Sequence, residues 1–217
     1  MIDPTNITNY NRTEAELEEF LMFCIMVAGK NAKQTAKKLD SFLFGTLGII
    51  SPLDWIQNLV NLEKNGISKN FPLMYCMKQH KLGQYKRLQS AFTGIIQFKN
   101  KLKSVSVEEL ESISGIGSKT SRFFVLHSRP NQRVAVLDTH ILKWMYAQGY
   151  DVPKMTPPKG KYAMIEKDFL TECDNAGKTP AEFDLEIWKI YSQKHNTLWY
   201  TTKNHKKIIW PIHQVMR

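Results

Sequence analysis

Three capping boxes, spread along the chain, constrain its fold more than any other sequence feature. In each box a serine or threonine is followed three residues later by a glutamate, and the two side chains cap each other's backbone amides at the start of a helix. The pairs are Thr13 with Glu16, Ser106 with Glu109, and Thr179 with Glu182. They predict helices near the beginning, the middle and the end of the chain.

Helical signals also fill the regions between these boxes. Apolar residues follow the spacing of one helical face at Leu17, Phe20, Leu21, Cys24 and Ala28. Ser51 before Pro52 is typical of a helix start. We expect further helices over 31–44, 119–127 and 138–148, with an extended stretch over 133–137. About ten helices in one chain predict an all-α protein.

Composition narrows the class of partner. Hydrophobic residues make up 42% of the 217, which is enough for a packed core, and the net charge is +10. Such a charge favours a polyanion, with nucleic acid the commonest candidate and an anionic membrane surface the rival. The longest apolar run, Phe20–Ala28, is too short to cross a bilayer and predicts a buried helix.

The cysteines and the N-terminus indicate a compartment. Cys24, Cys76 and Cys173 are too widely spaced to suggest a disulfide framework or a zinc cluster. This pattern suits a reducing cytoplasm, and no targeting segment is recognisable. We expect no metal and no cofactor.

The most informative segment spans residues 110–120. A short helix meets the turn Gly115-Ile116-Gly117 and a second helix follows. The glycines allow positive φ and close backbone approach, and the free amides at the second helix's start form an anion site. Gly115, Gly117, Ser118 and Thr120 are therefore candidate contacts to a DNA phosphate. The alternative is a plain connection between two helices.

Lys119 lies in the first turn of that second helix. The helix dipole disfavours a cation at this end, and partial desolvation acts in the same direction, so both favour the neutral amine. A neutral lysine is a nucleophile that forms Schiff bases. The alternative is a solvated lysine or a phosphate contact.

Asp138 follows nineteen residues later and has the position of a helix N-cap. A carboxylate fixed at a helix end can also serve chemistry. It can stabilise an oxocarbenium-like sugar cation as a base departs, or help to activate a lysine or a water molecule.

The two motifs together resemble a known signature. A Gly-Ile-Gly-x-Lys-Thr hairpin followed by Leu-Asp-Thr-His-Ile is similar to the helix-hairpin-helix DNA glycosylases. The resemblance implies that Lys119 and Asp138 are the catalytic pair and that His140 contacts a phosphate. Residues 83–87 resemble the segment that opens a helix of the family's barrel, which makes Lys86 and Arg87 further candidate DNA contacts. The implied partner is double-stranded DNA, bound by a monomer.

Within this superfamily the motifs are nearest to the archaeal-type 8-oxoguanine glycosylases. The stretch before Asp138 and the segment 183–188 resemble theirs, whereas their usual C-terminal lysine is matched by Arg217. The four-cysteine cluster of the iron–sulfur members is absent. The family implies two helical lobes with the hairpin at the cleft between them. One lobe would hold residues 16–128, with the hairpin at about 106–127, and the other would combine 1–15 with 129–217.

Aromatic residues supply candidates for a pocket that would hold a flipped base. They are Phe123, Trp188 and Tyr191, with Trp199, Tyr200 and Trp210 in the basic tail. Core packing is the alternative role for most of them. His195, His205 and His213 are not spaced like a compact metal site, and Lys203, Lys206 and Lys207 suggest a solvated or phosphate-facing patch.

The leading hypothesis is a glycosylase with AP lyase activity, and oxidised guanine is the first candidate base. Three alternatives stay open. The base could be a hypermodified one of the viral type, or Asp138 could activate water without a covalent step. The third alternative belongs to another class, a helix-hairpin-helix protein that binds DNA without catalysis.

Overall fold

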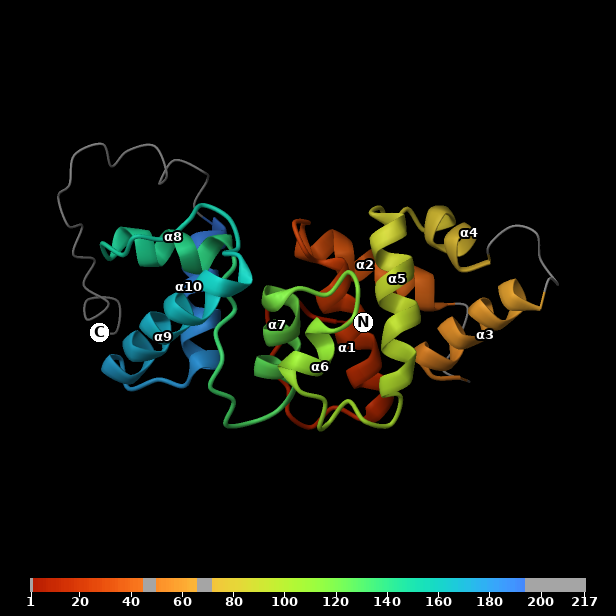
Figure 1. The fold of residues 1–217 in the computed structure, drawn as a ribbon, viewed down its shortest axis with the longest axis horizontal. Coiled ribbons are helices and arrows are strands. Elements are labelled where there is room, and N and C mark those ends of the chain that lie inside the picture. The colour runs from red at the N-terminus through yellow and green to blue at the C-terminus, as the bar shows by residue number, and fades with distance from the viewer. Residues whose placement is uncertain (1, 45–49, 66–71, 194–217) are drawn as a thin grey trace. The chain divides into compact units, whose positions relative to one another are not determined.

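The computed structural model describes residues 2–44, 50–65 and 72–193. Over these ranges the chain forms helices and no strand, which confirms the all-α prediction (Figure 1). The α-helices are α1 (Glu14–Met26), α2 (Ala32–Leu43), α3 (Pro52–Lys64), α4 (Pro72–Gln79), α5 (Tyr85–Ile95), α6 (Val107–Glu111), α7 (Ser118–Ser128), α8 (Thr139–Ala147), α9 (Lys159–Asn175) and α10 (Pro180–Gln193). A short 3-10 helix, η2 (Ile96–Phe98), continues α5.

The helices begin where the sequence places their caps. All three capping boxes form, at the starts of α1, α6 and α10. Asn31, Ser51 and Asp138 cap α2, α3 and α8 through their side chains. Each cap satisfies backbone amides that the helix itself leaves without an acceptor. Local sequence therefore sets most helix starts in the described part of the chain.

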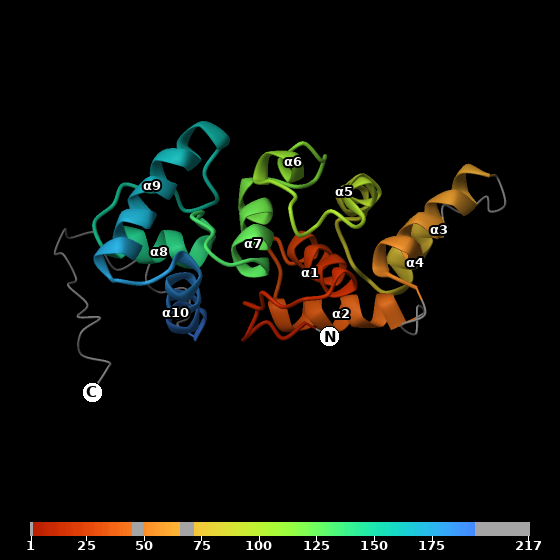
Figure 2. The same cartoon turned by 90° about the horizontal axis from the view of Figure 1, so that it is seen from below.

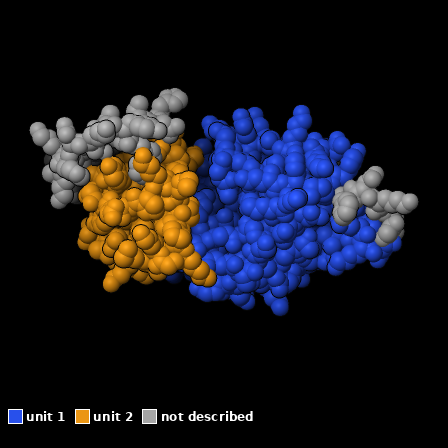
Figure 3. Space-filling view, turned by 45° about the horizontal axis from the view of Figure 1, so that its top comes forward, with its two compact units in different colours: residues 1–132 blue, residues 133–217 orange. Residues whose placement is uncertain are grey.

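The chain divides into two compact units, residues 1–132 and residues 133 onward (Figure 3). Residues 1–15, which the family resemblance groups with the second lobe, belong to the first unit. The contacts explain why. Asn9 donates its amide to the carbonyl of His127, and Arg12 donates its guanidinium to the same carbonyl at 3.0 Å. Thr8 also hydrogen-bonds the His127 ring.

The first unit is built around α1, which packs against α2, α3, α5 and α7 (Figure 2). Its residues from Phe20 to Met26 are all fully or almost fully buried, as the apolar run predicted. A helical segment that is apolar on every side, as this second half of α1 is, lowers its free energy by lying at the centre of a bundle. The helix α7, which carries Lys119 in its first turn, packs directly on this buried helix.

The second unit comprises α8, α9 and α10 around an aromatic core. The Trp144 ring meets Phe183 edge-on at 5.1 Å between centroids and Phe169 at 6.1 Å. These side chains come from all three helices and are buried. The packing fixes α8, and thereby the N-cap position of Asp138. No helix of the described residues is long and apolar enough to span a membrane.

Candidate active site

The predicted hairpin is formed by α6, a turn over residues 112–117, and α7. The turn is held by a short ladder in which the amides of Ile113 and Ile116 donate to the carbonyls of Leu110 and Ile113. These three apolar side chains are also buried. Behind the turn, Arg122 of α7 pairs with Glu111 of α6 at 2.5 Å, and both side chains are largely shielded. Hydrophobic burial and an ion pair therefore fix the two helices against each other.

Gly115 is the residue on which the turn depends. Its φ is +94°, and a Cβ at this position would lie 2.7 Å from the carbonyl oxygen of Arg87. Any larger residue would combine a strained conformation with a backbone clash. The close approach is secured by Arg87, which donates to the carbonyls of Gly115 at 2.9 Å and of Ile25 at 2.8 Å.

Arg87 consequently lies inside the protein's own hydrogen-bond network. Its Nε and Nη2 also donate to Gln84 Oε1, so every guanidinium nitrogen has an acceptor within the chain. Burial lowers the pKa of Arg87. The neighbouring Lys86, the other DNA contact expected from this segment, is exposed. The structure thus separates two adjacent cations, one of which braces the hairpin while the other faces solvent.

The start of α7 presents open backbone amides. Gly117 occupies the N-cap and provides no side-chain cap, while its carbonyl accepts from Thr120 and Ser121. Among the described residues, the amides of Gly117, Ser118 and Lys119 have no acceptor. A Cβ at Gly117 would meet nothing within 4 Å. The turn therefore offers an uncrowded group of donors at the positive end of a helix dipole.

Lys119 is half-buried and rests on an aromatic ring. Its Nζ lies 4.5 Å from the ring centroid of Phe123, one turn along α7. Phe123 is only 9% exposed, because Phe20, Phe23 and His127 surround its ring. In this structure Phe123, a candidate for the base pocket, supports the Lys119 side chain.

A buried thiol lies close to Lys119. Burial raises the pKa of the Cys24 thiol on α1, against the opposing influence of the nearby cations of Lys119 and Arg12. The thiol is therefore protonated and shielded from solvent. On α1 it comes one helical turn after Phe20 and directly after Phe23, and both of these rings pack against Phe123.

Asp138 is the N-cap of α8, as predicted. Its Oδ1 accepts from the amides of His140 at 2.8 Å and Ile141 at 3.0 Å. Its Oδ2 has no partner among the described residues, so one oxygen is anchored and the other is available. The backbone leading to it, Arg133–Leu137, is extended, also as predicted.

The other predicted site residues differ in accessibility. Thr120 is buried under the hairpin, while Ser118 is half-buried. The Nδ1 of His140 is buried without a hydrogen-bond partner, so a phosphate contact through this ring would use Nε2. Trp188 is half-buried, and Tyr191 is 6% exposed within the core of the second unit. The tail residues named above lie outside the described residues.

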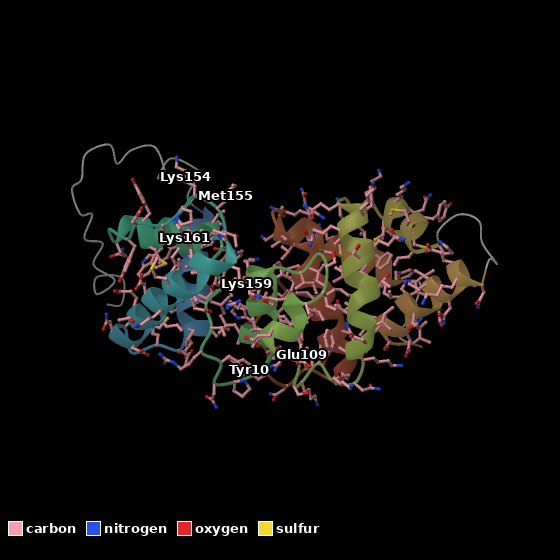
Figure 4. The ribbon with its side chains drawn as sticks, viewed as in Figure 1. Tyr10, Glu109, Lys154, Met155, Lys159 and Lys161 are labelled. Atoms are coloured by element: carbon pink, nitrogen blue, oxygen red, sulfur yellow. The ribbon has the colours of Figure 1, made fainter. Side chains whose placement is uncertain are left out.

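Sequence reasoning missed the residues that support Asp138. Thr156 donates to the carbonyl of Leu137 at 3.4 Å, and Tyr162 and Glu166 bond the same extended segment. Single polar residues in a loop and on a helix carry no pattern that points to such contacts. The loop 151–158 and the start of α9 also carry exposed Lys154, Lys159 and Lys161 beside Met155, which is 76% exposed (Figure 4). The sequence signal for this basic surface is three lysines within residues 154–161 with no acidic residue between them.

No metal centre was found among the described residues, since no group of three or more His, Cys, Asp or Glu side chains is placed to hold an ion.

Comparison with solved structures gives the fold a close counterpart. The 8-oxoguanine DNA glycosylase of Methanocaldococcus jannaschii matches with a TM-score of 0.63 over 87% of this chain and 84% of that chain, at 21% identity. The chain has the fold of the 8-oxoguanine DNA glycosylases. The Thermotoga maritima enzyme matches with a TM-score of 0.60 at 21% identity, over 84% of this chain and 82% of that one. This glycosylase fold agrees with the resemblance seen in the sequence motifs.

The sequence relation is more limited in extent. An 8-oxoguanine DNA glycosylase/AP lyase of Thermotoga sp. (strain RQ2) is 30% identical over 87 residues, which are 39% of this chain and 41% of that protein. The match thus spans less than half of the curated relative's length. A structure of the M. jannaschii glycosylase/lyase in complex with a 15mer DNA containing 8-oxoguanine matches with a TM-score of 0.61, at 23% identity over 85% of this chain and 84% of that one. No family model matches the chain.

Proposed function

We propose that this protein is a DNA glycosylase that removes 8-oxoguanine from duplex DNA and then cleaves the strand through a lysine Schiff base. One observation carries the proposal. The chain has the fold of the 8-oxoguanine glycosylases, and its Lys119 lies in the first turn of α7. The start of this helix has no side-chain cap, and its backbone amides are open. This arrangement combines an anion site with a nucleophile.

The hairpin would bind a backbone phosphate near the damaged nucleotide. The amides of Gly117, Ser118 and Lys119 donate to no described residue, and the glycine adds no bulk beside them. Phosphate oxygens are strong acceptors that suit such a group of donors. Binding of this kind reads no sequence, as a repair enzyme requires.

Lys119 would act as the nucleophile. Its neutral amine attacks C1′ of the flipped nucleotide, and the C1′–N9 bond breaks with its electron pair leaving on the base, which takes up a proton. The amine loses its proton and the sugar ring opens to an imine. Loss of a C2′ proton then breaks the 3′ C–O bond, which releases the 3′ phosphate, and water frees the enzyme.

Asp138 would stabilise positive charge that develops on the sugar as the base departs. Two backbone amides hold Oδ1, which orients the carboxylate, and Oδ2 has no described partner. A fixed negative oxygen stabilises a cationic transition state more than a neutral ground state. The carboxylate is thus preorganised for this role.

Borohydride trapping tests the proposal directly. The protein is incubated with duplexes that each carry one modified base, including 8-oxoguanine opposite cytosine, and with an undamaged duplex. We expect a covalent protein–DNA adduct and strand cleavage with 8-oxoguanine and neither with undamaged DNA. Base release from another modified base alone would reassign the substrate. DNA binding without release of any base would contradict catalysis altogether.

A further inference from the structure

No described residue forms a strand beside the extended segment before Asp138, yet the last three residues of this segment are buried. Ala135, Val136 and Leu137 are each 2% exposed or less. Buried backbone groups must be paired, because an unpaired donor or acceptor loses its bond to water without replacement. In a sheet a second strand would supply the partners. Here the partners are side chains from the loop 151–158 and α9.

Tyr162 supplies the most specific of these contacts. Its hydroxyl donates to the carbonyl of Ala135 at 2.8 Å and accepts from the amide of Leu137 at 3.0 Å. The side chain is 1% exposed, so water does not compete for either group. One hydroxyl therefore bridges two peptide groups on the same edge of the segment, as an adjacent strand would do.

Neighbouring side chains complete the set. Glu166, one helical turn after Tyr162, accepts from the amide of Ala135 at 2.8 Å, and Thr156 donates to the carbonyl of Leu137. The amide and carbonyl of both Ala135 and Leu137 are thus bonded to side chains. Of these three side chains, only Tyr162 holds the amide of Leu137, the residue directly before Asp138.

We infer that Tyr162 is a positioning residue for Asp138, an inference that rests on the proposed function. The peptide bond that Tyr162 holds at Leu137 lies directly ahead of the one that leads into Asp138. Without the hydroxyl, a buried amide and a buried carbonyl would each lose a partner, and the segment would shift to recover hydrogen bonds. Such a shift would move the carboxylate relative to the sugar while leaving the hairpin of the first unit unchanged.

The test compares Tyr162→Phe with the matched control Tyr150→Phe. Both variants remove one hydroxyl that bonds within the second unit. That of Tyr150 donates to Glu172 of α9 at 2.6 Å and makes no hydrogen bond to the segment before Asp138. Two rates are measured under single turnover: base release from an 8-oxoguanine duplex, and borohydride trapping on a duplex with a preformed abasic site. The second reaction needs no base departure and so depends less on Asp138.

We expect Tyr162→Phe to slow base release by on the order of tenfold to a hundredfold, the range in which a small misplacement of a reacting group affects rates. Trapping on the abasic duplex should stay within about twofold of the wild-type rate, since a neutral substitution within the second unit leaves Lys119 and its hairpin unchanged. Tyr150→Phe should leave both rates unchanged. Amide hydrogen exchange should show faster exchange at Leu137 in Tyr162→Phe only.

Each other outcome is decisive. Equal loss in both reactions would show a merely structural role and overturn the inference, and so would unchanged rates or unchanged protection of the Leu137 amide. If the wild-type protein traps the abasic duplex and releases 8-oxoguanine, these outcomes count against Tyr162 alone. If the wild type does neither, the proposed function fails and the inference fails with it.

Discussion

Lys119 and Asp138 are placed by two different kinds of local structure. The turn before Lys119 is shaped by its own glycine, a ladder of short-range hydrogen bonds and buried isoleucines, with Arg87 of α5 as a brace. The segment before Asp138 takes its hydrogen bonds from side chains about twenty to thirty residues further along the chain. A sequence therefore reveals a lysine on a local turn more readily than it reveals the distant side chains that support a carboxylate.

Replacement of Lys119 should have the largest effect of all the substitutions. Lys119→Gln should abolish borohydride trapping, because an amide does not form a Schiff base. DNA affinity should fall by no more than a few-fold, since only one positive charge is lost. Gel analysis of trapped adducts and fluorescence anisotropy measure the two effects. If this variant released the base at near the wild-type rate, the covalent mechanism would be wrong, and a water molecule activated by Asp138 would be the attacking group.

Asp138→Asn should have the next largest effect. The amide oxygen of asparagine can still accept from His140 and Ile141, so the helix cap and the fold should persist. Base release should slow by about 10²–10³-fold, since a neutral group stabilises developing positive charge far less than a carboxylate. Single-turnover kinetics with a circular dichroism control measure this. Full activity of this variant would show that Asp138 has no catalytic role.

Glycine substitutions sharpen the contrast within the hairpin itself. Gly115→Ala should lower the free energy of unfolding by about 1–3 kcal/mol, because alanine would be strained at a φ of +94°. The added Cβ would also clash with the carbonyl oxygen of Arg87. Gly117→Ala should change stability by less than about 0.5 kcal/mol, since its Cβ meets nothing. It should nevertheless weaken DNA binding by crowding the open amides. Urea denaturation and anisotropy separate the two, and equal destabilisation would refute this view of the turn.

The smallest expected effect distinguishes the two adjacent cations of α5. Lys86→Gln should reduce the log–log salt dependence of DNA binding by about 0.9 if this exposed lysine neutralises one phosphate. Stability should not change. Arg87→Gln should instead destabilise the protein, because the carbonyls of Gly115 and Ile25 would lose their donors. Affinity measured over a range of salt concentrations, together with denaturation, would expose a reversal of these roles.

The sequence predicts the features that depend on neighbouring residues and misses those that depend on distant contacts. Capping boxes, the glycine turn and the N-cap at Asp138 depend on residues within a few positions of each other, and these predictions are confirmed. The inward orientation of Arg87 depends on how closely α5 approaches the turn. The docking of the N-terminal arm depends on a carbonyl at His127, more than a hundred residues away. Tertiary approach decides such features, and no local pattern records it.

The buried thiol of Cys24 has a consequence for survival under oxidative stress. Hydrogen peroxide reacts with exposed thiolates, whereas Cys24 is fully buried and burial raises its pKa. Its sulfur therefore stays reduced under the conditions that damage guanine. A sulfenic acid at Cys24 would add a polar oxygen to the buried face of α1 that also carries Phe20 and Phe23. The packing of α1 thus keeps an oxidisable sulfur away from solvent.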